Sequence, residues 1–402
     1  MTDTPLSENE VLPLIIRQLI AYGYSAIAQT VADSTGANCD MIPSSKLSEL
    51  IRLGKERDQE ESEDDYEPND NNQLVDNNIG AITTSGFDPE SITSVSKPAP
   101  QYTQLYYTQH KGPCRTSVFS KDGRFAATGS YDASLKLLDV RKMKNRTGGA
   151  SDKPVIRTLY DHTAPVNDLS FHPNGLVLAS CADDHSIKLF DLSKAGVKRA
   201  FRYLQDTQPV NSISFHPSGD FLLAGTQDSN VRVYDVNTLQ CYTNRSSVDK
   251  HSGAITQIRY SDSGKIFASS SIDGTVKIWD CVSSQCIKVL DKVHGGMAVS
   301  SVRLTRNEKY ILTAGLDSHL RLWDITSGKL LMEYSGHEQR TQMLQPDFTF
   351  NESFIVMGDE ASTDVICWDT QTGTLLKRIS GQNNLVRCVA ASPIDNGIIS
   401  CR

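Results

Sequence analysis

The chain has 402 residues, of which 38% are hydrophobic and 22% charged, and a formal net charge of −8. This composition is typical of globular proteins and allows a sizeable core. No apolar run approaches the roughly 20 residues needed to cross a bilayer, and the acidic N-terminus lacks the basic start of a signal peptide. We therefore expect an intracellular protein without a membrane span.

Residues 1–55 are predicted to be helical. Apolar side chains recur at steps of three and four through 9–33 and again through 46–57, with Gly23 indicating a break between two short helices. So small a unit cannot easily bury all of them alone, so it must pack on the large domain or on another copy of itself. The residues that we assign to a two-fold interface are Ile15, Leu19, Tyr22, Ile27, Leu47, Leu50 and Ile51.

Residues 56–101 are predicted to be an acidic, disordered linker. The stretch 56–96 holds twelve acidic residues and one basic residue, together with many asparagines and few apolar positions. It is longer than an ordinary loop, which indicates a domain boundary. Because most of the negative charge lies here, the domain that follows is mildly basic.

Residues 102–402 contain an internal repeat. Pairs of aspartates separated by six residues recur at Asp132/Asp139, Asp184/Asp191, Asp228/Asp235, Asp273/Asp280 and Asp317/Asp324. The first members are 52, 44, 45 and 44 residues apart, and a sixth unit ends at Trp368-Asp369. Repeats of this length with Trp-Asp-like endings are typical of the WD-repeat β-propeller, with four short strands per blade. We predict an all-β propeller of seven blades.

The seventh unit begins near Leu385 and reaches Arg402, so we expect the last blade to be truncated by at least one strand. A strand near 101–109 is expected to close the ring from the N-terminal side. Even with this strand, an incomplete blade would expose a sheet edge.

Two similar stretches, SFHPNG and SFHPSG, contain histidines that invite a metal-site or catalytic interpretation. Other units have FSKDG and YSDSG at the same hairpin, so His172 and His216 are interchangeable with Ser120 and Ser261. We interpret the motif as a turn, because Pro fixes φ and Gly permits positive φ.

WD-repeat families carry a buried tetrad of His, Ser or Thr, Asp and Trp in each well-formed blade. Two units match completely, with His251, Ser269, Asp273 and Trp279 in one and His294, Thr313, Asp317 and Trp323 in the other. Two further units lack the Trp, with His162, Ser180, Asp184 and Phe190 in one and His110, Thr128, Asp132 and Leu138 in the other. The third unit has Asp206, Asp228 and Tyr234, and the sixth has His337 and Trp368 without an Asp in register.

These histidine–aspartate pairs are interpreted as structural. A catalytic site occurs once in a fold and its residues converge, whereas these sets repeat around a ring. No nucleophile elbow, phosphate-binding glycine loop or HExxH motif is present. The nine cysteines are scattered and include no C-x-x-C pair, so we expect no structural zinc and no disulfide framework. We therefore predict no catalytic residues, no metal and no cofactor.

The blocks KGPCR, PVIRTLYDH, KRAFRYLQ and FHPSGDFLLAGTQ lie outside the general repeat pattern. They closely resemble the WD-repeat subunit of cleavage stimulation factor, a complex that helps to select and cut the 3′ end of pre-mRNA before polyadenylation. The resemblance extends over nearly the whole chain except the acidic linker. It implies a nuclear scaffold with no enzymatic activity.

The same resemblance implies specific partners. Residues 1–55 would form a homodimerisation domain, and the propeller would bind the large HAT-repeat subunit and other subunits of the complex. Pre-mRNA would be reached indirectly through those subunits. Two rival functions stay open, an adaptor of another complex such as a ubiquitin ligase substrate receptor, and a propeller that binds RNA directly. For the second rival, the positive charge of the propeller is modest, and basic residues are not clustered with aromatic ones except at KRAFRYLQ and, more weakly, at LYDH.

Overall fold

The computed structural model describes residues 97–145, 153–194, 196, 198–243 and 249–402, together with Ile16, Gln29 and Ala32. The chain divides into two compact units, Met1–Ile82 and Thr83–Arg402. In the first unit the three described residues are helical. All seven residues assigned to the homodimer interface lie outside the described residues, as does the predicted boundary between 55 and 56.

The second unit is built from antiparallel four-stranded sheets, the blades, each numbered from the inner strand outward. Blade one has β1 (Cys114–Phe119), β2 (Phe125–Ser130), β3 (Ser134–Asp139) and β4 (Val155–Tyr160), with the helix α4 (Val140–Lys144) after β3. Blade two has β5 (Val166–Phe171), β6 (Val177–Ala182), β7 (Ser186–Asp191) and β8 (Arg202–Gln205). Blade three has β9 (Val210–Phe215), β10 (Phe221–Thr226), β11 (Val231–Asp235) and β12 (Cys241–Thr243).

The remaining blades follow in chain order. Blade four has β13 (Ile255–Tyr260), β14 (Ile266–Ser271), β15 (Val276–Asp280) and β16 (Cys286–Leu290). Blade five has β17 (Val299–Leu304), β18 (Tyr310–Gly315), β19 (Leu320–Asp324) and β20 (Leu330–Tyr334). Blade six has β21 (Asp347–Phe348), β22 (Phe354–Gly358), β23 (Val365–Asp369) and β24 (Leu375–Ile379). A two-stranded sheet then follows, with β25 (Cys388–Ala391) and β26 (Ile398–Cys401).

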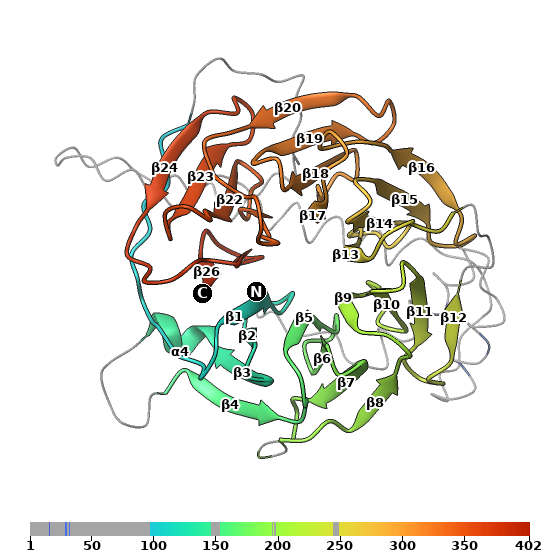
Figure 1. The fold of residues 1–402 in the computed structure, drawn as a ribbon. Coiled ribbons are helices and arrows are strands. Elements are labelled where there is room, and N and C mark those ends of the chain that lie inside the picture. The colour runs from blue at the N-terminus through green and yellow to red at the C-terminus, as the bar shows by residue number, and fades with distance from the viewer. Residues whose placement is uncertain are drawn as a thin grey trace, which may run out of the picture. The chain divides into compact units, whose positions relative to one another are not determined.

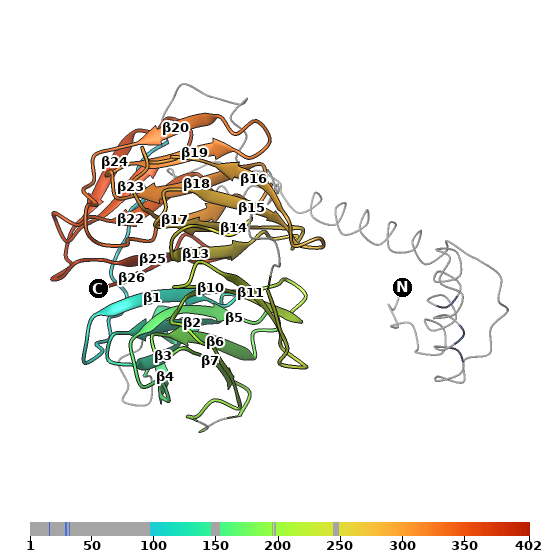
Figure 2. The same cartoon turned by 45° about the vertical axis from the view of Figure 1, so that its right-hand side comes forward.

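The blades stand in a ring, with their inner strands β1, β5, β9, β13 and β17 closest to its centre (Figure 1). Figures 1 and 2 both place β25 and β26 between blade six and blade one. The N–H of Cys114 on β1 donates to the carbonyl of Arg402 at 2.7 Å, and the side chains of Cys114, Cys388 and Cys401 form a small buried cluster at this junction. The prediction of an all-β WD-repeat propeller is confirmed, with six four-stranded blades.

The predicted strand at 101–109 is wrong, because residues 98–110 form no regular secondary structure. Contacts that involve side chains, rather than a ladder of backbone hydrogen bonds, hold this segment against the propeller. Lys97 donates from its backbone N–H to Asp369 at 3.1 Å and from Nζ to Ser353 at 2.9 Å, and Tyr106 packs against a buried cluster in blade one that includes Leu138. The segment, cyan in Figure 1, thus runs down the outside of the ring from blade six to blade one. Lys97, which lies inside the predicted linker, already contacts the propeller.

A repeated backbone bulge joins neighbouring blades. The inner strands of blades one to five each skip one residue in their register with the second strand, which leaves that residue unpaired in the ladder. Its side chain reaches the next blade. Asn167 donates to the carbonyl of Val210 at 2.9 Å, and Thr256 donates to that of Val299 at 2.6 Å. Polar residues at this position therefore fix the spacing of the ring, while apolar clusters fill the space between the sheets.

Among the described residues, no helix is long and apolar enough to cross a membrane.

Candidate functional site

Blades four and five bring the two complete sets of sequence-predicted residues into contact. In blade four, His251 lies 3.2 Å from Asp273 through Nδ1 and 2.8 Å from Ser269 through Nε2, and Trp279 donates to Ser269 at 2.8 Å. In blade five, the corresponding distances are 2.7 Å from His294 to Asp317, 2.9 Å from His294 to Thr313 and 3.1 Å from Trp323 to Thr313. Each set is a continuous chain from carboxylate to indole.

Blades two and one lack the indole and differ from each other at the carboxylate. His162 contacts Asp184 at 2.8 Å and Ser180 at 2.6 Å. His110 contacts Thr128 at 2.9 Å, but its Nδ1 is 3.7 Å from Asp132. Ser134 fills that gap, since its Oγ lies 2.7 Å from the His110 ring and donates to Asp132 at 2.6 Å. The direct His110–Asp132 hydrogen bond expected from the sequence is therefore replaced by a relay through a hydroxyl.

Blade three keeps the network with different chemistry. Asp206 occupies the histidine place and accepts a hydrogen bond from Tyr234 at 2.6 Å. Arg232 lies between Asp206 and Asp228, at 3.2 Å and 3.0 Å. Burial and the hydrogen bond to Asp206 raise the pKa of Tyr234, which keeps its hydroxyl protonated as a donor. A guanidinium between two carboxylates thus replaces the imidazole.

The sequence analysis found no Asp in register in the sixth unit. That was wrong, because Asp359 occupies the position of the tetrad carboxylate in blade six. It accepts the N–H of Glu338, the residue after His337, at 2.7 Å. Asp184 and Asp273 accept the N–H of the residue after their own histidine in the same way, at 3.1 Å and 2.9 Å. The turn after Asp359 is longer than in the other blades, which shifts Trp368 out of the spacing that the other repeats share.

The tetrad carboxylates stay ionised throughout the physiological range. Burial alone would raise the pKa of Asp184, Asp273 and Asp317, but hydrogen bonds from their histidines and from nearby hydroxyl, backbone or guanidinium donors outweigh it and hold each pKa well below its usual range. For Asp132, hydrogen bonds led by those from Ser134 lower the pKa to about 2 against the effect of burial. Their contribution to stability is therefore present above the unfolded carboxyl pKa and is lost only as the pH falls below about 4.

His337 provides a pH-dependent prediction at higher pH. It is buried with neither ring nitrogen hydrogen-bonded, and its ring meets Trp368 edge-on at 5.4 Å. Burial lowers its pKa to about 4, partly opposed by Asp359 and Asp317 and aided by His319 and Arg378. Below an unfolded pKa of about 6.5 the unfolded chain binds the proton first, so the folded state loses stability as the pH falls from about 6.5 to about 4.

The expected result is a loss of up to about 3 kcal/mol from this group over that range. His337→Phe removes the titration and should give a visibly shallower decline in the free energy of unfolding, measured by denaturant titration between pH 7.5 and pH 4.5. Above pH 7 the two proteins should give parallel curves. Equal slopes across the acidic range would contradict the assignment.

A second polar network, which the sequence analysis missed, joins the inner strands at the centre of the ring. The Asp168 carboxylate on β5 is held by both terminal nitrogens of Arg259 on β13, at 2.7 Å and 3.1 Å. It also accepts from Ser212 on β9 at 2.6 Å and from Thr116 on β1 at 3.4 Å. One carboxylate therefore links the inner strands of four consecutive blades. The signal in the sequence was an Asp in the middle of an inner strand where other repeats have Ser, Thr or Gln.

Arg303 on β17 continues this network toward blade six. Its Nε lies 3.4 Å from Asp347 on β21. Burial and the neighbouring Arg259 lower the pKa of Arg303. Arg259 and Arg303 therefore form a charge-balanced array with Asp168 and Asp347 at the centre of the ring.

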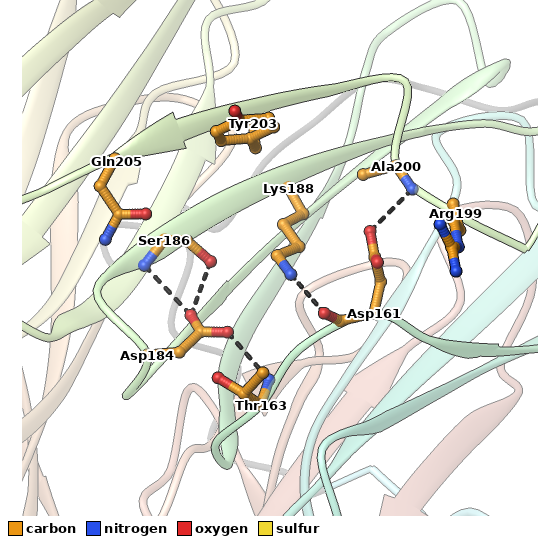
Figure 3. A pocket seen from close by; sticks show the side chains of 9 residues that line it. All are labelled: Asp161, Thr163, Asp184, Ser186, Lys188, Arg199, Ala200, Tyr203 and Gln205. Atoms are coloured by element: carbon orange, nitrogen blue, oxygen red, sulfur yellow. Dashed lines mark hydrogen bonds between the residues drawn. The ribbon is translucent and has the colours of Figure 1, made fainter.

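A shallow hollow of about 400 Å³ opens on the outer side of blade two (Figure 3). It is lined by Asp161, Thr163, Asp184, Ser186, Lys188, Arg199, Ala200, Tyr203 and Gln205. Lys188 donates from Nζ to the carbonyl of Asp161, and the Asp161 carboxylate accepts the N–H of Ala200 at 2.9 Å. The hollow thus has a polar floor beside the tetrad of the same blade. Within the described ranges, no group of three or more His, Cys, Asp or Glu side chains is arranged to hold a metal ion.

His172 and His216 lie apart from these networks, at the hairpins between the first and second strands. His172 packs edge-on against Phe215 at 5.2 Å and His216 against Tyr260 at 5.0 Å. Each ring therefore contacts the next blade, and Nε2 of His216 also lies 3.3 Å from the carbonyl of Gly264 there.

Comparison with known proteins agrees with this architecture. The family model described as WD domain, G-beta repeat matches residues 101–139, 153–191, 201–235, 242–280 and 284–324. From the second segment on, each match runs from the outer strand of one blade to the third strand of the next. The β-propeller domain of Cps50 (Swd1) from Myceliophteria thermophila has the same fold, with a TM-score of 0.62 and 17% sequence identity over 73% of this chain and 95% of that chain.

The ring of four-stranded blades and the repeated tetrads define a WD-repeat propeller. Among curated proteins, COMPASS component SWD3 of Saccharomyces cerevisiae is 24% identical over 190 residues, 46% of this chain and 57% of that protein. Cleavage stimulation factor subunit 50 of Arabidopsis thaliana is 38% identical over 397 residues, which cover 96% of this chain and 92% of the relative. The chain belongs to the family of the WD-repeat subunit of cleavage stimulation factor.

Proposed function

We propose that this protein is a non-catalytic scaffold subunit of cleavage stimulation factor that acts in the nucleus in pre-mRNA 3′-end cleavage and polyadenylation. The observation that carries the proposal is the 38% identity over 96% of the chain to cleavage stimulation factor subunit 50. A similarity of this extent includes the regions outside the propeller, which a general likeness between WD-repeat proteins does not.

The polar networks support a scaffold over an enzyme. Every tetrad carboxylate is engaged by nearby donors, and the sets recur from blade to blade. A general acid or base must be free to exchange a proton with a substrate, and its pKa should lie near the working pH. The pKa values of Asp184, Asp273 and Asp317 lie far below that range.

The partners in this proposal are the HAT-repeat subunit and the other subunits of the complex, with the propeller as the docking platform. Rigid blades with polar, hydrogen-bonded turns offer a stable surface for such contacts. The pre-mRNA is reached through the assembled complex.

The direct test is co-purification from nuclear extract with the bound proteins identified by mass spectrometry. A tagged full-length chain should recover the HAT-repeat subunit and the other subunits of cleavage stimulation factor. An equally tagged unrelated propeller is the control. Recovery of ubiquitin ligase subunits in their place would contradict the proposal.

Homodimerisation through residues 1–55 is part of the proposal and gives a separate prediction. Leu19→Asp should convert the full-length chain from dimer to monomer at tens of micromolar, as measured by light scattering. A two-fold interface uses each buried Leu or Ile twice, and each contributes about 1.5–3 kcal/mol. Gln18→Asp, a neighbouring polar position outside the apolar repeat, should leave the dimer intact. If the unmodified chain is already monomeric at that concentration, this part of the proposal fails.

A further inference from the structure

Two basic and aromatic segments that are distant in the sequence meet on one surface. Tyr160 is the last residue of β4, the outer strand of blade one, and Asp161 follows it. Residues 198–201 lead into β8, the outer strand of blade two, which contains Tyr203. The hydrogen bond from the N–H of Ala200 to the Asp161 carboxylate, 2.9 Å long, joins them. Lys188 bonds the same turn through the carbonyl of Asp161. Figure 3 shows Tyr203, Lys188, Arg199 and Asp161 around the hollow of blade two.

Three large aromatic side chains on this surface face solvent. Tyr160 is 61% exposed, Phe201 47% and Tyr203 69%. Aromatic rings are usually at least partly covered, because each one buries a large apolar area. Exposed tyrosines and phenylalanines next to cations provide the stacking faces that single-stranded nucleic acids use.

The charges on the surface are available to an anion. Lys198 and Arg199 are exposed, and neither forms an ion pair with a described residue. The two carboxylates in the hollow are already engaged. Asp161 accepts from Ala200, and Asp184 accepts from His162 at 2.8 Å and from the N–H of Thr163 at 3.1 Å. With Asp161 and Asp184 counted against Lys188, Lys198 and Arg199, the surface carries a net charge of +1, and Lys198 and Arg199 precede the exposed rings of Phe201 and Tyr203 in the chain.

We propose that this aromatic–basic surface, formed by Tyr160, Lys188, Lys198, Arg199, Phe201 and Tyr203, binds single-stranded RNA directly. Bases stack on Tyr160 and Tyr203, and backbone phosphates contact Lys198 and Arg199. Thr163, Ser186 and Gln205 line the hollow between them and offer hydrogen-bonding groups to ribose hydroxyls and base edges. Apart from Ala200, every side chain that lines the hollow ends in a charged or hydrogen-bonding group, so the hollow favours RNA over a peptide that would anchor through buried apolar side chains. This goes beyond the scaffold function, in which the transcript is reached through other subunits.

The test measures the binding of the full-length chain to a fluorescently labelled single-stranded oligouridylate of about 12 nucleotides by anisotropy. Tyr203→Ala should weaken binding about 10-fold, since stacking contributes strongly for each base. Tyr242→Ala removes an exposed tyrosine from the outer strand of blade three and should leave the affinity unchanged. Both side chains are exposed, so neither substitution removes core packing, and thermal melting checks that each variant is folded.

The charge contribution is tested by salt dependence. Lys198→Ala with Arg199→Ala should reduce the slope of log affinity against log salt by about 1.4, which corresponds to two phosphate contacts on a single strand. Lys309→Ala with Lys329→Ala removes two exposed charges from blade five and should leave the slope unchanged. Equal effects of the two pairs would indicate diffuse electrostatic attraction and would overturn the proposal.

Absence of measurable binding at low salt would also overturn it. So would a Tyr203→Ala variant that binds RNA normally but fails to recover a cleavage stimulation factor subunit from nuclear extract, because the surface would then be a protein-docking site.

Discussion

Asp168→Ala should lower the free energy of unfolding by about 3–5 kcal/mol, measured by denaturant titration at pH 7. The carboxylate is 2% exposed and its bidentate partner Arg259 is 18% exposed. Removal of one member leaves a buried guanidinium without its counter-charge, and that desolvated charge is the main source of the cost. The substitution also removes the acceptor for Ser212 and Thr116, which lie on different blades. We therefore expect the loss to affect the whole ring.

A solvent-exposed ion pair between blades one and two provides the control. Arg115 lies 3.3 Å from Asp183, but these side chains are 31% and 39% exposed. Arg115→Ala should cost less than about 1 kcal/mol, because water replaces the lost partner. In a double-mutant cycle, Asp168→Ala with Arg259→Ala should cost less than the sum of the two single changes. Additive losses would show that the two residues do not act as a pair.

Asp273→Ala should destabilise the propeller by roughly 1–3 kcal/mol or more. The carboxylate accepts the N–H of Ser252 at 2.9 Å and the N–H and hydroxyl of Thr275 at 2.9 Å and 2.7 Å, in addition to its contact with His251. Alanine leaves these donors without an acceptor in a site that water reaches poorly. Thermal and denaturant unfolding would both report the change.

The matched controls are His172→Ala and His216→Ala. These rings also repeat between blades, but His172 makes one edge-on aromatic contact, with Phe215, and His216 makes two, with Phe221 and Tyr260, each worth about 0.5–1.5 kcal/mol. If either variant lost as much free energy of unfolding as Asp273→Ala, the tetrads would not contribute more to stability than these hairpin histidines, and the assignment would be contradicted.

The repeat period predicted the tetrad partners in blades four and five because that information is local. A histidine, a second-strand hydroxyl and a turn aspartate recur at nearly constant spacing, and the antiparallel blade brings them together wherever the strands form. The same reasoning failed in blade six, because a longer turn moved Trp368 away from Asp359 without disturbing the hydrogen bond to Glu338. Spacing is a reliable guide only while the turns keep their length.

Two other features depended on context that a repeat pattern does not contain. Residues 101–109 read as a strand, since they occupy the place of an outer strand in the repeat, but they are held by side-chain contacts such as those of Lys97 and Tyr106. In blade three, the exchange of His for Asp206 was visible in the sequence. Its compensation by Arg232 required the distance across the sheet.

The sequence by itself determined the class of this protein, an all-β WD-repeat propeller, because alternating strands, turn residues and a repeat of about 44 residues are local properties of the chain. Only the tertiary structure decided which residues hold the ring together and which surface is left open. Asp168 and Arg259 are 91 residues apart and meet at the centre of the ring, and Asp161 accepts a hydrogen bond from the N–H of Ala200, 39 residues further along the chain. Ring closure brings such residues together, and the geometry of closure depends on all the blades at once.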